Sequence, residues 1–144
     1  MTFKYVCLAA VSVLMAGCTL ETSGNGALDG YWHLEQVDTL STGRSADMSG
    51  SRIFWSFSVR LMNVSDRDGK HGDFLLRFEN DGNTLRTYDP HKNDRPNGDP
   101  AVDDVEALKP FGINAMEDTF RVERLKGAKM VLSTKKLRLS FTKF

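Results

Sequence analysis

Cysteine is scarce in this sequence, whose 144 residues include only Cys7 and Cys18. Both precede residue 19, so the rest of the chain has no thiol for a disulfide or for a cysteine nucleophile. A domain without cross-links has to be held together by its own apolar core.

Net charge is also absent, because 19 Lys and Arg residues balance 19 Asp and Glu residues. A balanced chain lacks the excess of cations that binding to nucleic acid requires, so we expect no nucleic-acid partner. Cations do gather in residues 119–144, but solvated outer faces of strands explain them better than a patch for anionic lipid headgroups or polysaccharide.

The residue patterns of known catalytic and metal sites are missing as well. The chain has three histidines, His33, His71 and His91, with neither helical spacing nor an HExxH motif. There is no Gly-x-Ser-x-Gly, and no carboxylate lies in a strongly apolar run that would raise its pKa. Turn residues explain the Asp-rich segment 89–104 better than a calcium loop does. We therefore expect no enzyme, no metal and no cofactor.

The longest apolar run, residues 5–16, is too short to span a bilayer as a helix. It follows Lys4 and precedes Gly17 and Cys18, which is typical of a signal peptide over residues 1–17. An ordinary signal peptide with a chance cysteine is the alternative to the lipoprotein described next.

The segment Leu14–Cys18 resembles a bacterial lipoprotein box, although Met15 replaces its usual Leu. The resemblance implies that Cys18 becomes the first mature residue, carries lipid and anchors the protein to a membrane. Thr19 rather than Asp follows the cysteine, so the familiar inner-membrane retention signal is absent. We expect the outer membrane of a Gram-negative bacterium, on the periplasmic or the surface side, with residues 18–27 as lipidated cysteine and flexible tether.

Residues 28–144 show period-two alternation of apolar and polar side chains, interrupted by turn residues. Seven runs read as strands: residues 31–38, 52–64, 73–79, 84–88, 119–125, 129–134 and 136–144. Residues 105–113 are ambiguous between an eighth strand and a helical turn ended by Pro110. An antiparallel meander closes with antiparallel neighbours only if its strand number is even. The expected fold is all-β, an up-and-down meander closing into an eight-stranded barrel, with a sandwich as the alternative.

Gly30-Tyr31-Trp32 at the start of the first strand resembles the Gly-x-Trp signature of lipocalin-like barrels, and residues 120–143 look like the tail of small bacterial lipocalin-like lipoproteins. The resemblance implies that Trp32 plugs the closed end of the barrel under a basic residue of the last strand. Lys143 shares a face with Leu137, Leu139 and Phe141, so we expect it to pack on Trp32.

Trp55, Phe57 and Val59 share one face of the second run and would point into the barrel, with Phe78 on a neighbouring strand. We expect these four residues to bind a small apolar ligand at an open end opposite Trp32. Loop 39–51 would cover that end, together with loops 80–83, 112–118 and 133–136. The alternative is an accessory or inhibitor protein of the envelope that acts through loops 39–51 and 89–104 without a small ligand. In either case we expect a monomer.

Overall fold

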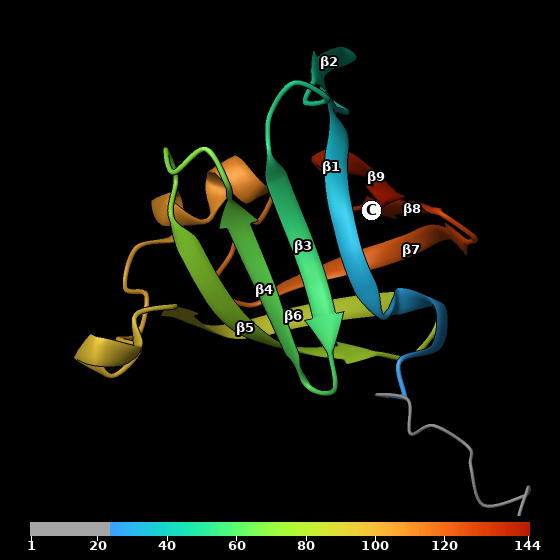
Figure 1. Cartoon of the computed structure of the whole chain (residues 1–144). Helices are drawn as coiled ribbons and strands as arrows, with labels where there is room; N and C mark the ends of the chain where they lie inside the picture. The colour runs from blue at the N-terminus through green and yellow to red at the C-terminus, as the bar shows by residue number, and fades with distance from the viewer. Residues whose placement is uncertain (1–23) are drawn as a thin grey trace, which may run out of the picture.

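The computed structural model describes residues 24–144, so the predicted signal peptide and the predicted lipidation site Cys18 lie outside the described residues (Figure 1). Nine strands and four short 3₁₀ turns make up the domain. In chain order they are η1 Gly26–Leu28, β1 Gly30–Thr39, β2 Arg44–Asp47, β3 Ile53–Ser58, β4 Leu61–Asp66, β5 Asp73–Asn80, β6 Thr84–Lys92, η2 Arg95–Asn97, η3 Val105–Ala107, η4 Lys109–Phe111, β7 Asp118–Lys126, β8 Lys129–Ser133 and β9 Leu137–Lys143.

Eight of these strands form a closed antiparallel barrel. The order runs from β1 through β3 to β9, and β9 pairs with β1 to close the sheet. The ninth strand, β2, pairs with the far half of β1 and forms a hairpin at the edge of the barrel. The prediction of an eight-stranded up-and-down barrel is therefore confirmed.

The eight strands are not the eight that the sequence predicted. The run 52–64 contains two strands, β3 and β4, joined by a two-residue turn at Val59 and Arg60. Residues 105–111, the candidate eighth strand, form η3 and η4 instead. A turn of this kind needs a positive φ at its first residue, where Gly is usual, and Val59 takes φ 57°. The residue pattern does not predict this turn, because it contains no Gly, Asn or Asp.

The extra turn also changes which connections share an end of the barrel. One end, the Trp32 end, carries η1 and the turns 59–60, 81–83 and 127–128. In Figure 1 the turn between β3 and β4 lies at the lower edge of the barrel and the turn between β7 and β8 at its right. The other, the connection end, carries the segments 40–52, 67–72, 93–117 and 134–136. Loop 80–83 was expected at the open end with loop 39–51, and the structure places it at the opposite end.

The core is a single cluster of apolar side chains inside the barrel. It includes Trp32, Trp55 and Phe120, none of which is exposed to solvent. Residues 102–113 add Val102, Leu108, Phe111 and Ile113 to the same cluster. The long connection between β6 and β7 is thus part of the core as well as a surface loop.

Candidate ligand pocket

The Trp32 end is closed by packing around the indole. Trp32 is fully buried, and its Nε1 donates a hydrogen bond of 2.9 Å to the carbonyl of Leu28. Lys143 Nζ lies 5.1 Å from the ring centroid of Trp32, on the core side where the register of the last strand predicts it. A Cβ at Gly30 would lie 2.8 Å from Cε of Lys143, and Gly30 has φ +122°. The glycine of the signature therefore leaves room for the lysine that covers the tryptophan.

The interior where a ligand was expected is filled by side chains. Trp55 pairs directly with Trp32 across β1 and β3, and its ring centroid lies 5.0 Å from that of Phe141. Phe57 and Phe78 are buried against each other with their centroids 5.1 Å apart. Trp55 is therefore a core residue beside Trp32 and does not lie at an open mouth.

The expectation that Val59 points into the barrel is wrong. Its side chain lies at the tip of the β3–β4 turn and is 59% exposed. Because the turn reverses the chain, Met62 and Val64 take the inward positions on β4, and Leu61 points outward.

The connection end, expected to be open, is plugged by the segment around η3 and η4. Leu108, Phe111 and Ile113 are fully buried there. The carbonyl of Phe111 accepts a hydrogen bond of 3.0 Å from Trp55 Nε1. The ring of Phe111 also packs edge-on against Phe74, with centroids 5.7 Å apart. Both ends of the barrel are consequently closed.

A pocket lies instead on the outer face, where a bulge interrupts the pairing of β5 with β6. Leu75 pairs with His91 and Arg77 with Tyr88, so Leu76 faces two residues of β6, Asp89 and Pro90. Asp89 takes φ 54°, the left-handed conformation typical of one kind of bulge. A bulge redirects side chains, and here it points those of Asp89 and His91 toward the outer surface.

The chain beyond β6 turns back over this bulge. The amide of Lys92 donates to the carbonyl of Pro100, and the amide of Val102 donates to that of Pro90. The turn between them contains η2 and ends at Asp99, which has φ 48°. Two non-glycine residues of this small region thus have strained backbones, a feature that clusters at functional sites.

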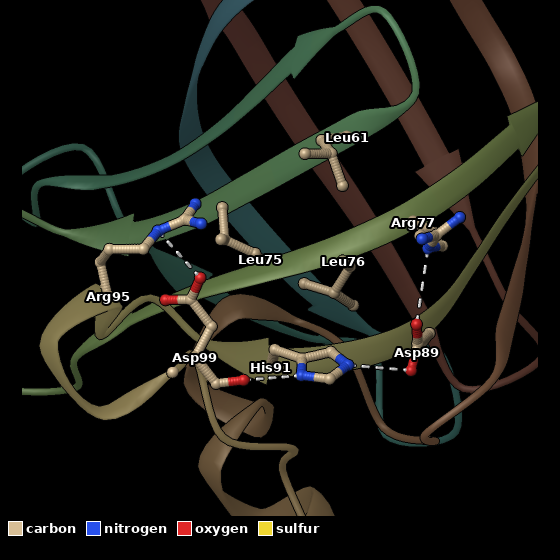
Figure 2. Close-up of a pocket in the computed structure, with 9 residues that line it drawn as sticks. Leu61, Leu75, Leu76, Arg77, Asp89, His91, Arg95 and Asp99 are labelled. Carbon is tan, nitrogen blue, oxygen red and sulfur yellow. Dashed lines mark hydrogen bonds and ion pairs between the residues drawn. The ribbon is translucent and has the colours of Figure 1, made fainter.

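The pocket between the bulge and this turn has a volume of about 300 Å³ (Figure 2). One wall is apolar and consists of Leu61 on β4 with Leu75 on β5. The charged wall is formed by Arg77, farther along β5, together with Asp89 and His91 on β6 and with Arg95 and Asp99 in the returning turn.

His91 is held between two acceptors. Nδ1 lies 2.8 Å from the carbonyl oxygen of Asp99, and Nε2 lies 3.0 Å from Oδ1 of Asp89. A neutral imidazole has a single N–H and can donate to only one of them, so the arrangement favours the doubly protonated ring. The carbonyl of Asp99, and then the carboxylate of Asp89, raise the pKa of His91 above its ordinary value.

Two arginines pair with the same two carboxylates. Arg77 Nε lies 3.5 Å from Oδ2 of Asp89, and Arg95 Nε lies 3.3 Å from Oδ2 of Asp99. With His91 protonated, the pocket has three positive and two negative side chains. The charged wall is therefore net cationic when His91 carries its proton.

The comparisons with known proteins agree with this architecture. The model of the lipocalin-like domain family matches residues 13–144. This chain belongs to the lipocalin-like domain family. The matched region begins before the described residues and includes all of them.

Two solved structures have the same fold as this lipocalin-like domain. A lipocalin-like protein from Bacteroides uniformis ATCC 8492 is similar at 22% identity and a TM-score of 0.63, over 83% of this chain and 100% of that one. An uncharacterized protein from Bacteroides eggerthii DSM 20697 is similar at 21% identity and a TM-score of 0.61, over 81% and 99%. No curated protein matches the chain.

In this lipocalin-like domain the predicted ligand residues and the observed pocket are different sets. Trp55, Phe57 and Phe78 lie in the core, and Val59 lies in an exposed turn. One signal in the sequence pointed to the pocket: Leu75 puts an apolar side chain on the outer face of a strand whose neighbours Phe74 and Leu76 point inward. The hydrogen bonds of His91 had no such signal, since they depend on the bulge and on the returning turn.

The other histidines are well separated from His91. His33 Nδ1 lies 2.8 Å from Oε1 of Glu35 on the outer face of β1, and His71 lines a different pocket at the connection end. Within residues 24–144, no three His, Cys, Asp or Glu side chains are grouped as a metal site requires. The same residues contain no helix with the length and apolar character needed to cross a membrane.

Proposed function

We propose that this lipocalin-like protein is a lipid-anchored envelope protein that binds a small amphipathic anion on the outside of its barrel. The pocket that would hold the ligand lies between Leu61 and His91. The observation that carries the proposal is the junction there of exposed leucine side chains with a charged wall, which is net cationic when His91 is protonated. The proposed protein binds its ligand without catalysing a reaction and is therefore a binding protein, not an enzyme.

The apolar wall supports a ligand with a hydrocarbon part. Leu61 is 50% exposed, and Leu75 is half-buried beside it. Covering such surface is favourable by about 25 cal/mol for each Å² removed from water. Arg77, Arg95 and protonated His91 surround the other side, where an anionic group would find donors.

The filled interior supports placing the ligand outside. Lipocalin barrels of eight strands have room for one small molecule when side chains leave the centre open. Here Trp55, Phe111 and Phe141 occupy that space, and Trp55 contacts the ring of Phe141 and donates to the carbonyl of Phe111. The anchor rests on the sequence around Cys18, and mass spectrometry of the mature protein would test it by showing whether that residue carries acyl chains.

Octanoate is a suitable probe for the pocket, with octanol as its uncharged counterpart. We expect octanoate to bind at least tenfold more tightly than octanol in isothermal titration calorimetry. The change Leu61→Asp should weaken octanoate binding at least tenfold, whereas Leu40→Asp at the connection end should not, since Leu40 is a comparably exposed leucine at 38%. Equal binding by the two variants would contradict the proposal.

Octanoate binding should also depend on the protonation of His91. Because the fold raises the pKa of His91, the charged ring contributes fully below its ordinary pKa of about 6.5. That contribution is lost as the pH rises through the raised value. We therefore expect affinity to fall over that window in the wild type. Asp89→Asn, which removes the negative charge beside the imidazolium, should move the fall to lower pH.

A protein partner is the second candidate, and the β2 hairpin favours it. All four residues of Arg44–Asp47 are exposed, and the hairpin stands beyond the upper end of the barrel (Figure 1). Pull-down from envelope extracts with and without residues 40–47 would test it, with a partner lost on deletion as the supporting result.

A further inference from the structure

We infer that the Trp32 end of the barrel docks on the lipid bilayer that holds the anchor, with Val59 at the contact. This inference rests on the lipid anchor of the proposed function and does not require a ligand in the pocket, although Leu61 lies beside both surfaces. It starts from the placement of the exposed apolar side chains.

Four large apolar side chains of the described residues are strongly exposed, and three of them lie at or beside the Trp32 end. Val59 is 59% exposed and Phe144 is 88% exposed, and Leu61 follows the turn of Val59 directly. The fourth, Leu40, lies at the connection end. Phe144 is placed by its amide, which donates to the carbonyl of Tyr31 near the start of β1. The strongly exposed apolar side chains are thus unevenly distributed, with three of four toward one end of the barrel.

Val59 is the most informative of the three because it is both exposed and strained. A β-branched residue at φ 57° costs folding free energy that Gly would not cost. More than half of its surface is exposed, so burial inside the domain offsets little of this cost. An apolar side chain at the tip of a turn gains stability only if something outside the domain covers it.

The chain segment that leads to the anchor starts from the same end. Asn25 Nδ2 donates a hydrogen bond of 2.9 Å to the carbonyl of Val59, and the carbonyl of Ala27 accepts one of 3.4 Å from Lys143 Nζ. The six peptide steps from Cys18 to Gly24 reach at most about 20 Å. A lipidated Cys18 would therefore keep this end of the barrel near the headgroups.

The charges at this end suit an anionic surface. Arg60, Lys126 and Lys129 are exposed at the turns beside Val59 and between β7 and β8. Asp29 and Asp81 lie at the same end, but each is engaged locally. Asp29 accepts from Asn25, and Asp81 accepts from backbone amides of its own turn. Peripheral membrane proteins commonly insert an apolar segment into the bilayer and place Lys and Arg side chains around it, near anionic headgroups.

Fluorescence quenching in vesicles tests this face in the full lipidated chain. Val59→Cys and, as the matched control, Leu40→Cys would each be labelled with an environment-sensitive dye and reconstituted in phosphatidylethanolamine–phosphatidylglycerol vesicles that contain a doxyl lipid. Both positions are exposed, and thermal unfolding of each variant checks that it folds. We expect at least twofold quenching at position 59 and none at position 40.

Flotation of the vesicles separates a failure of the face from a failure of the anchor. If the protein floats and neither label is quenched, or both are quenched equally, the docking face is overturned and the anchor survives. If the protein does not float, both are overturned. Octanoate binding in solution reports on the pocket in either case.

Discussion

The two ends of the barrel are closed in different ways. At the Trp32 end, the hydrogen bond of the indole goes to Leu28, four residues earlier, and the cation comes from the strand that closes the barrel. At the connection end, the hydrogen bond of Trp55 goes to Phe111, 56 residues later, in a segment of 3₁₀ turns.

The difference shows that one end of the barrel is closed by residues that a local sequence pattern identifies, and the other by residues that it does not. The first end uses a glycine, a tryptophan and a lysine at fixed positions in regular strands. The second uses three apolar residues from a connection rich in Pro, Gly and Asp, whose inward direction is set only when it meets the core. We expect loss of side-chain bulk to cost more at the Trp32 end than at the connection end, and the connection end to depend in addition on its backbone shape at Gly112.

Trp32→Ala should have the largest effect of the changes that compare the two ends. Removing a fully buried indole from a packed core costs about 3–5 kcal/mol, which is a large part of the stability of a small domain. Urea unfolding followed by circular dichroism measures it. A folded variant of near wild-type stability would show that the indole does not close this end.

Phe111→Ala is the matching change at the connection end. We expect a cost of about 3–4 kcal/mol, below that of Trp32→Ala, because the surrounding connection has few strand contacts and relaxes into part of the cavity. Urea unfolding gives the cost, and the remaining cavity should bind a small apolar probe such as benzene, detected by a rise in melting temperature. A cost as large as that of Trp32→Ala would remove the contrast between the ends.

Gly112→Ala tests backbone shape at the connection end. Gly112 has φ +87°, and a Cβ there would lie 2.8 Å from Cδ1 of Leu139. We expect a loss of about 2–3 kcal/mol. Gly98→Ala is the control, since Gly98 has φ +77° but a Cβ there would meet nothing within 4 Å. This variant should lose only about 1 kcal/mol of stability. Equal losses, measured by thermal unfolding, would show that the contact with Leu139 costs nothing.

Lys143→Met should have the smallest effect. The change keeps the apolar stem of the side chain and removes the ammonium group 5.1 Å from the Trp32 ring, at a cost of about 0.5–2 kcal/mol. Lys129→Met serves as the control because Lys129 is exposed and contacts Thr142 instead of a ring. Denaturation curves of the two variants that coincide would argue against a stabilising cation at Trp32.

Much of the barrel was predictable from local pattern, and the pocket was not. The alternation of apolar and polar side chains predicted β1 and the strands from β5 to β9, because each of these strands has one face in the core. The turn at Val59 was missed because Val is a rare residue there, and this error put the side chain of Val59 inside the barrel. The even strand number was correct because barrel closure demands it, although the strand assumed to complete it was the wrong one.

The sequence by itself determined a closed antiparallel barrel with Trp32 at one end, because alternation, strand parity and the Gly-x-Trp pattern are all local or countable properties. Only the tertiary structure decided that the interior is full and that the exposed pocket lies outside. The packing of Phe111 on Phe74 and the hydrogen bonds of His91 join segments that are separated in the sequence. No local pattern in these segments predicts that they meet. Their positions follow from how the barrel closes, since a side chain occupies whatever space its neighbours leave.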